Sequence, residues 1–508
     1  MDKKIALKRQ LKKKSSLLSF RYRGKRTFVV VPGLNHPKSV DLSGVSGLES
    51  YEERMLFFLF LLKYKNTKIV YVVSKGFSQD LIDYYVWQIS DAQSDYQEKI
   101  SRLTIIEIDD DRKISLTQKI LENAKNITRI KKAIGDPKTS FLRCYNPTKQ
   151  ERKLALKLGI PLFGSDQKFD FVGTKSGARK VFRLSKANVV PGISDISTFT
   201  KLCDSISQLA KKYPETKRMM IKRNYSSSGK GNCIFLLGAM LESEAVDLKK
   251  ISKDDLTKLI KRNFESFANY QNPNTNYEEY KQRFNITGGI VELYIESENK
   301  YSPSTQAIIS SNHNYRIVST HEQILGGEDK QLYLGCEFPS LDSHRKLIIK
   351  EGEKIVGWLA KKGIVGNFAI DYVVTYDKDW KNPKVFPIEI NLRKGGTTHP
   401  FRITYFLTGA RYNKNTGLLQ CGKVPIYYHS MDFIESEKYK KLTPAELIKA
   451  VSGSKISFNK DTKKGVLLFM PGMITEFGRF GAVCIGHSRE EAKQYYKKLV
   501  KLINSLTA

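Results

Sequence analysis

Runs of apolar residues alternate with amphipathic stretches along the first third of the chain. Phe28–Val31 is apolar, and Lys68–Ser74 and Leu103–Ile108 repeat that pattern, as buried strands do. The stretch 51–63 has the length and composition of a buried helix. Strands that alternate with helices predict a parallel α/β sheet, in a lobe that should end near the Gly-Ile-Pro sequence at 159–161.

From residue 173 onward, predicted strands outnumber helices, so this region should be α+β. Helical patterns cover 175–186 and 249–270. Beyond Phe401, short segments punctuated by glycines precede a last helix at Arg489–Leu506. The predicted strands are Arg218–Lys222, Cys233–Leu237, Gly289–Ile295, Thr305–Ser310, Arg316–Ser319, Phe368–Tyr376 and Val385–Ile390.

Size and composition predict a compact protein of two to four domains. The chain has 508 residues, of which 40% are hydrophobic and 11% aromatic, and a domain usually takes about 100–200 residues. The six cysteines stand singly, without the spacing of a zinc or redox site, and indicate buried thiols in a reducing compartment. No apolar run approaches the roughly 18 residues of a membrane span, and the N-terminus lacks an apolar signal-peptide core. We therefore expect a cytoplasmic protein.

The charge of the chain is strongly basic. Lysines and arginines number 86 and acidic residues 52, which gives a net charge of +34 and favours acidic substrates or polyanionic partners. No zinc-finger, RNP-like or helix-turn-helix pattern accompanies the basic residues, so nucleic-acid binding has little support, and a lysine-biased proteome would give the same excess. The basic segment 1–26 is expected to be solvated, with an amphipathic helix that touches membrane or nucleic acid as the alternative.

Two carboxylates and an amide are predicted to face one another across a β-hairpin. The strands flank a polar loop, and pairing that is symmetric about Trp380 sets Asp371 opposite Glu389. The two-residue period of a strand puts Asn391 on the same face. Like charges directly opposite each other destabilise a sheet, so we expect Mg²⁺ to compensate them, with Mn²⁺ as the alternative metal. Acids on a solvated face are the structural alternative.

A basic, glycine-rich segment follows these residues. Arg393 can bind a carboxylate or a transferring phosphoryl group through its planar fork, and Gly395-Gly396 lets the backbone approach a ligand closely. His399 either contacts substrate or acts as a base, or it is structural, as a histidine before a proline in a loop often is.

The nucleotide side carries a weaker signal. The strand that ends at Lys222 leads into the loop Ser226–Gly231, whose small residues can cover phosphates with backbone N–H groups. The loop lacks the Walker spacing and no helix follows, so a plain glycine hairpin fits it equally well. Glu292 lies on a later strand that could meet an adenine and ribose edge.

The order of these features resembles the ATP-grasp superfamily: a lysine, a strand lysine with a glycine-rich loop, a glutamate-bearing strand, and then Asp…Glu-x-Asn-x-Arg. Other segments are similar to the pre-ATP-grasp lobe and the terminal domain of peptide ligases related to the pheganomycin-forming enzyme. These segments are Tyr51-Glu52-Glu53-Arg54, Ile82-Asp83-Tyr84-Tyr85, Asp109-Asp110, 150–155, 158–161, 173–179, 395–401 and 481–486. The resemblance covers nearly the whole chain from Thr27. After the basic segment at 1–26, it implies a pre-ATP-grasp α/β domain at 27–165, an ATP-grasp domain at 166–400 with a lid at about 190–290, and a small α+β C-terminal domain at 401–508.

The resemblance also implies roles for single residues. Leu293 departs from it, since many relatives have a polar or charged residue there, and base selectivity is therefore less defined than metal binding. The implied catalytic residues are Arg393, near the acyl phosphate, Lys222 and His399. The implied ligands are Lys175, Lys222, Ser227, Ser228, Gly229 and Gly231 for the phosphates of ATP, Glu292, Leu293 and Ile295 for the nucleoside, and Asp371, Glu389 and Asn391 for one or two Mg²⁺.

The implied reaction is the ATP-dependent formation of an amide. A carboxylate attacks the γ-phosphate, and an amine displaces phosphate from the resulting acyl phosphate. The substrates would be small-molecule or peptide carboxylates and amines, of which the basic charge favours acidic ones, and the enzyme could be a homodimer. The alternatives are a phosphotransferase without ligation, and a nucleic-acid- or acidic-protein-binding factor with a regulatory ATP site. The intact Asp371, Glu389, Asn391 and Arg393 count against the second alternative.

Overall fold

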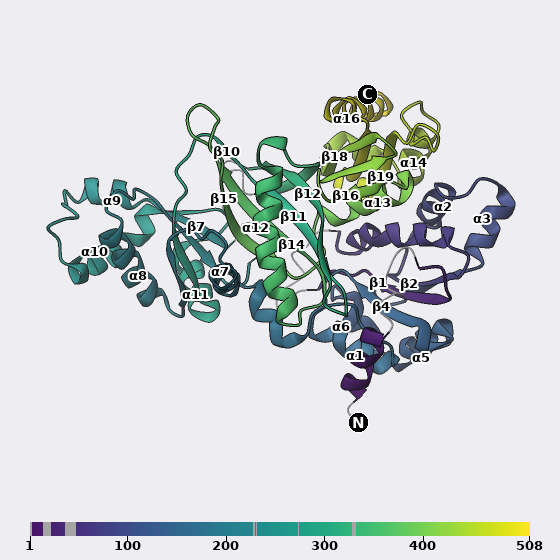
Figure 1. Cartoon of the computed structure of the whole chain (residues 1–508), viewed down its shortest axis with the longest axis horizontal. Coiled ribbons are helices and arrows are strands. Elements are labelled where there is room, and N and C mark those ends of the chain that lie inside the picture. The colour runs from purple at the N-terminus through teal and green to yellow at the C-terminus, as the bar shows by residue number, and fades with distance from the viewer. Residues whose placement is uncertain are drawn as a thin grey trace.

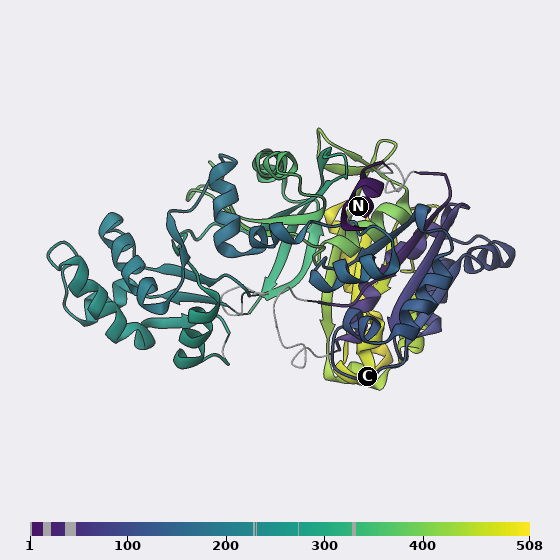
Figure 2. The same cartoon turned by 90° about the horizontal axis from the view of Figure 1, so that it is seen from below.

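A computed structural model describes residues 3–13, 22–35, 47–226, 229, 231–272, 274–327 and 332–507. Figure 1 shows the lid (192–293) at the left, a central sheet crossed by a long helix in the middle, and the N-terminal lobe beneath the C-terminal segment at the right. Figure 2 shows from a perpendicular direction that the lid and the N-terminal lobe lie at opposite ends of the molecule. Within the described ranges, no helix combines the length and apolar character needed to cross a membrane.

The N-terminal lobe contains a parallel sheet in the order β3-β2-β1-β4, which confirms the predicted α/β sheet. Phe28 and Val30 of β1 face one hydrophobic core, and Val29 and Val31 face the other, as the two-residue period requires. The pattern does not predict β4, which is short and carries the buried Arg143. The elements, in which η marks a 3₁₀ helix, are β1 (Arg26–Val31), η3 (Glu49–Lys63), β2 (Thr67–Ser74), α2 (Gln79–Trp87), α3 (Gln93–Ile100), β3 (Leu103–Ile108), α4 (Leu116–Glu122), α5 (Ala124–Ile134), η4 (Pro137–Thr139), β4 (Ser140–Cys144) and α6 (Lys149–Leu158).

The lid is an antiparallel sheet in the order β5-β9-β6-β7-β8, covered by helices. Phe199, Phe235 and Phe264 belong to the hydrophobic core of the lid. Among the described residues, this core shares no member with the core of the central sheet. Two elements lead into the lid, η5 (Gln167–Gly173) and α7 (Lys175–Leu184). The elements of the lid are β5 (Gly192–Ile196), α8 (Phe199–Lys212), β6 (Met219–Arg223), β7 (Asn232–Phe235), α9 (Leu237–Ser243), α10 (Lys253–Phe267), β8 (Ala268–Tyr270), α11 (Tyr277–Thr287) and β9 (Gly289–Leu293).

The central sheet is antiparallel and continues into the C-terminal segment. Its order is β10-β14-β11-β12-β13-β18-β17-β16, with β15 beside β14 and β20 between β18 and β19. Gly335 of β13 pairs with Met431 of β18, so one sheet crosses the predicted boundary at residue 400. The elements are β10 (Lys300–Tyr301), β11 (Pro303–Ile309), β12 (Tyr315–Gly326), β13 (Leu332–Phe338), α12 (Asp342–Lys361), β14 (Gly366–Thr375), β15 (Lys384–Asn391), α13 (Thr398–Thr408), β16 (Arg411–Asn413), β17 (Leu418–Cys421), β18 (Val424–Glu435), η6 (Glu437–Lys441), α14 (Pro444–Ser452), β19 (Gly465–Phe469), η7 (Pro471–Met473), α15 (Ile474–Phe477), β20 (Arg479–Gly486) and α16 (Arg489–Leu506).

The N-terminal segment departs from the expectation of a solvated terminus. Lys3–Lys13 forms helix α1, whose Leu11 is buried beside Phe141 and Phe163. Lys8 pairs with Asp166. Lys4 also pairs with Asp166, and Gln10 donates to the carbonyls of Pro137 and Lys138, so apolar, ionic and hydrogen-bond contacts dock this basic helix on the lobe. Five of the six cysteines are buried free thiols, as predicted, whereas Cys421 is half-buried.

Candidate active site

The predicted carboxylate pair forms across the hairpin of β14 and β15. Asp371 pairs with Glu389, and Ala369 pairs with Asn391, in antiparallel register. The amide Nδ2 of Asn391 donates to Oδ2 of Asp371 over 2.9 Å, which places the three side chains in one cluster. A β-bulge follows Asp371, so the pairs nearer the loop lie one residue out of that register. The predicted pairing is confirmed.

The two carboxylates titrate differently because their surroundings differ. Burial and the charge of Glu389 raise the pKa of Asp371 to about 7, against the opposing charges of Arg393 and Lys175. Burial alone would raise the pKa of Glu389 as well, but the charge of Lys175 and its hydrogen bond lower it. Each carboxylate thus carries its negative charge more readily when a cation is close to it. Hard oxygen ligands under this constraint fit a divalent cation such as Mg²⁺.

Lys175 connects the start of α7 to this pair. Thr174 caps the helix by accepting a hydrogen bond from the backbone N–H of Gly177, which fixes the position of the lysine in the first turn. Lys175 is 7% exposed, and its Nζ lies 2.7 Å from Oε1 of Glu389. The first predicted phosphate-binding lysine and a predicted metal ligand therefore form an ion pair.

Lys222 lies on the facing side, in strand β6 of the lid. Its Nζ lies 2.8 Å from Oε2 of the buried Glu292 on β9, and Arg179 of α7 pairs with the other oxygen of that carboxylate. Burial opposes the negative charge of Glu292, but the two cations lower its pKa overall. Lys222 also lowers the pKa of Glu389, so the lysines of the lid and of the body act on the same carboxylate. Glu292, predicted to hold the nucleoside, is engaged here in a buried ion triad.

The glycine-rich loop joins β6 to β7 as a hairpin. Gly229 has a φ of 73°, a conformation that favours glycine, and its carbonyl accepts from the N–H of Asn232 over 2.8 Å. A Cβ on Gly231 would lie 2.4 Å from Cβ of Ser226, so the hairpin needs a glycine there too. Ser227 and Ser228, also predicted to cover phosphates, lie outside the described residues. A loop that covers phosphates and a plain glycine hairpin would both have this hairpin geometry, so the geometry does not distinguish the two interpretations.

The predicted nucleoside-binding segment follows β9 where the chain returns to the body. The N–H of Leu293 donates to the carbonyl of Pro191 over 2.9 Å, so this donor is already used. The backbone of Ile295 has no hydrogen-bond partner among the described residues. The backbone groups of Ile295 are therefore better placed than those of Leu293 to pair with a base edge.

The segment after β15 is fixed between the central sheet and the N-terminal lobe. Arg393 is half-buried and donates to the carbonyl of Lys394 over 2.9 Å. Lys394 is buried, and its Nζ donates to the carbonyl of Cys144 at the end of β4. A Cβ on Gly396 would lie 2.4 Å from the ring of Tyr333. Packing against protein therefore explains this glycine without a ligand.

His399 lies in the first turn of α13, 2% exposed. Its ring centroid lies 4.3 Å from that of Phe469, and its Nε2 is 3.4 Å from Oδ1 of the fully buried Asp432. Arg54 donates to the other oxygen of Asp432 over 2.8 Å. Burial lowers the pKa of His399 despite this carboxylate. This environment agrees with the structural alternative for His399.

Two residues that contact the predicted site residues, Arg179 and Gln323, have no role in the sequence prediction. Arg179 lies four residues after Lys175 on α7, and this helical spacing could have placed both on one face. Gln323 of β12 donates to Oδ1 of Asp371 over 3.3 Å. No spacing reveals Gln323, because its approach depends on the strand order of the central sheet.

The chain is similar to known families and proteins. Residues 168–415 match a family model described as IQCH-like, ATP-grasp, and residues 446–499 match the PGM1 C-terminal domain. The L-propargylglycine–L-glutamate ligase of Streptantibioticus cattleyicolor is 24% identical over 468 residues, which cover 91% of each chain. The IQ motif-containing protein H of Danio rerio is 21% identical over 429 residues, which are 78% of this chain and 40% of that protein.

Solved structures show the same fold. An ADP complex of N5-carboxyaminoimidazole ribonucleotide synthetase superposes with a TM-score of 0.52 at 12% identity, covering 96% of this chain and 98% of the other. The biotin carboxylase–β-γ-ATP complex from Campylobacter jejuni gives a TM-score of 0.53 at 14% identity, covering 95% of both chains. The predicted fold is thereby confirmed, while the limits of the predicted domains and the roles of single residues stay predictions.

Proposed function

We propose that this chain is an ATP-grasp ligase that joins a carboxylate to an amine by way of an acyl phosphate, with release of ADP and phosphate. The observation that supports this reaction best is the ion pair of Lys175 with Glu389, over 2.7 Å, beside the carboxylate of Asp371, while the charge of Lys222 on the lid also lowers the pKa of Glu389. Asp371 and Arg393 complete the group. Cations from the lid and the body thus act on a carboxylate pair, and phosphoryl transfer uses such cations and metal-holding carboxylates around the phosphates.

The ion pairs of the site support an exchange of partners when ATP binds. Lys175 is held by Glu389 and Lys222 by Glu292, so neither lysine is buried without an opposite charge. Phosphate oxygens would take over the lysines, while Arg179 keeps Glu292 paired. Breaking a buried ion pair without replacement costs about 3–5 kcal/mol, and an exchange avoids most of this cost.

The metal would bind at the carboxylate pair. Asp371 and Glu389 offer oxygen donors whose mutual repulsion a cation relieves, and Asn391 would offer its amide oxygen. When bound, Mg²⁺, or Mn²⁺ in its place, would offset the charge that develops on the phosphates. Gln323 and Asn391 both donate to Asp371 and hold its carboxylate in place.

Arg393 would bind the acyl phosphate or the carboxylate that becomes activated. It follows Asn391 by two residues, and its charge lowers the pKa of both Asp371 and Glu389. Lys394 anchors the same segment to Cys144 of the N-terminal lobe. An arginine anchored in this way can present a planar fork to a carboxylate or a phosphoryl group.

The substrates would be amino acids or short peptides. The relative from Streptantibioticus cattleyicolor is a ligase of L-propargylglycine and L-glutamate by name, and the net charge of +34 favours an acidic substrate here too. The test is mass spectrometry of reactions with pooled amino acids and peptides, ATP and Mg²⁺. We expect a new amide together with ADP and phosphate. A phosphorylated product without an amide would establish a phosphotransferase, and AMP with pyrophosphate would exclude the acyl phosphate.

A further inference from the structure

The body and the lid meet at a seam in the hydrophobic packing. Among the described residues, α7 and Ala187 belong to the core of the central sheet, and β5 and α8 belong to the core of the lid. Val189 still packs against the first core, whereas Ile193 packs against the second. The chain therefore changes from one packed unit to the other within the residues between Val189 and Ile193. A rotation of the lid would change the distance between α7 and α8 at this seam.

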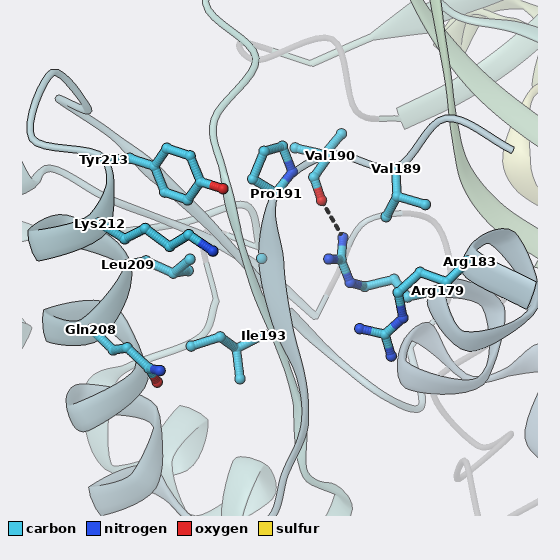
Figure 3. A pocket seen from close by; sticks show the side chains of 11 residues that line it. Arg179, Arg183, Val189, Val190, Pro191, Ile193, Gln208, Leu209, Lys212 and Tyr213 are labelled. Carbon is cyan, nitrogen blue, oxygen red and sulfur yellow. Dashed lines mark hydrogen bonds between the residues drawn. The ribbon is translucent and has the colours of Figure 1, made fainter. Parts of the chain in front are cut away.

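A cavity of about 270 Å³ lies at this seam, which we call the seam pocket. Figure 3 shows Arg179 and Arg183 of α7 on one side and Gln208 and Lys212 of α8 on the other, with the start of β5 between them. Its walls thus come from both packed units. A molecule that touches both walls would restrain their relative motion.

The walls of the seam pocket combine positive charge with apolar surface. Arg183 and Lys212 are exposed and have no acidic partner among the described residues, and no acidic side chain lines the pocket. Val189, Pro191 and Leu209 supply apolar surface. Small-molecule sites commonly pair a mostly apolar wall with a few placed polar groups. This lining fits a small anion that carries an apolar group.

A buried residue of the seam pocket, Arg179, also belongs to the nucleotide side. Arg179 is 3% exposed and donates to the carbonyl of Val190 over 2.9 Å and to Oγ of Ser194 over 3.0 Å. The same guanidinium pairs with Glu292, whose other oxygen lies 2.8 Å from Nζ of Lys222. Contacts therefore run without a gap from the pocket to a predicted phosphate-binding lysine.

We propose that the seam pocket binds a small organic anion, a carboxylate or phosphate attached to an apolar group, and that the bound anion restrains the lid and changes the affinity for nucleotide. The anion would pair with Arg183 from the body and Lys212 from the lid, while its apolar part covers Pro191 and Leu209. Arg179 transmits the restraint because it contacts both the pocket and Glu292. This goes beyond the ligase reaction, since no substrate has to turn over for the anion to bind.

Calorimetry of the full chain tests the binding step. Phenyl phosphate and phenylacetate are titrated separately, with benzyl alcohol as the neutral probe, in the presence of saturating ADP and Mg²⁺ so that the nucleotide site is filled. We expect at least one anion to bind and Arg183→Ala/Lys212→Ala to weaken it at least tenfold. The control Lys180→Ala/Lys201→Ala removes the same charge from exposed positions of α7 and α8 and should bind as the wild type does. Whichever anion binds more tightly identifies phosphate or carboxylate as the preferred group.

Three results would overturn the pocket: neither anion binds, benzyl alcohol binds as tightly as the anions, or the control variant loses as much affinity as Arg183→Ala/Lys212→Ala. The coupling is tested by the dissociation constant of ADP–Mg²⁺ with and without the saturating anion. We expect a change of at least threefold in the wild type and none in Arg183→Ala/Lys212→Ala, with the same factor when the order of addition is reversed. Equal constants would overturn the coupling. Failure of the wild type to bind ADP in the absence of anion would instead count against the proposed ligase.

Discussion

Lys222→Met should weaken nucleotide binding while leaving the lid folded. Lys222 is 8% exposed, and its Nζ lies 2.8 Å from the carboxylate of Glu292. Methionine has a similar length, and Arg179 still neutralises Glu292 in the variant, so we expect a folding cost of only about 1 kcal/mol.

The loss of affinity follows from the contact that the nucleotide would forgo. A hydrogen bond to a charged group contributes about 1.5–3 kcal/mol, and about 1.4 kcal/mol corresponds to a factor of ten. The free protein already uses Lys222 to bind Glu292, and this contact must be given up when phosphate arrives. We therefore expect the lower part of that range, a rise of about 10- to 30-fold in the dissociation constant of ADP–Mg²⁺.

Calorimetry with ADP and Mg²⁺ measures this change directly. Lys217→Met is the matched control, because Lys217 precedes the same strand but is exposed. Unchanged affinity in Lys222→Met, or an equal loss in Lys217→Met, would refute the assignment of Lys222 to the phosphates. If Lys222→Met lost a comparable amount of affinity for the amine substrate, the proposal that Lys222 binds only the nucleotide would be refuted.

Three further results are expected. Glu292→Gln leaves Lys222 and Arg179 buried without a carboxylate, which should lower the free energy of unfolding by about 3–5 kcal/mol. Amide hydrogen exchange in β6 and β9 should therefore become faster, and unchanged exchange would contradict the ion triad. Asp371→Asn and Glu389→Gln should each abolish ADP release with an unchanged circular dichroism spectrum, and turnover near the wild-type level would exclude the metal site. The KM for an acidic substrate should rise with salt as the Debye length falls to about 8 Å at physiological ionic strength; equal sensitivity for a neutral substrate would remove substrate steering as the role of the net charge.

The sequence predicts the carboxylate pair correctly, although the hairpin is less regular than the prediction assumes. Symmetric pairing about Trp380 sets Asp371 opposite Glu389, and these residues do pair. Nearer the loop, however, Tyr372 pairs with Pro387, one residue out of that register. Without the bulge after Asp371, the register in which Tyr372 pairs with Pro387 would continue along the strands. Asp371 would then lie opposite the neighbour of Glu389 instead of Glu389 itself. A shift of one residue turns a side chain to the other face of a strand, so the bulge is what brings the two carboxylates together.

Contacts between distant elements could not be predicted in this way. The approach of Gln323 to Asp371 depends on β12 lying two strands from β14. The pairing of Arg179 with Glu292 depends on how α7 packs against the lid. His399 illustrates the same limit, because only the packing of α13 against β18 and β19 shows that Asp432 is its polar neighbour. Local patterns identify residue types, whereas partners are set by tertiary structure.

The N-terminal lobe and the C-terminal segment pack against each other. One hydrophobic core contains Phe28 of β1, Phe58 and Phe60 of η3, and Leu468 of β19 and Val483 of β20. Figure 1 shows the N-terminal lobe and the C-terminal segment side by side. The face of the N-terminal sheet that carries Phe28 is therefore covered partly by residues more than 400 positions later in the chain. Apolar surface of this extent would be exposed to water if either part were removed. The two terminal segments thus share one hydrophobic core, and the central sheet on which Asp371 and Glu389 lie continues into the C-terminal segment.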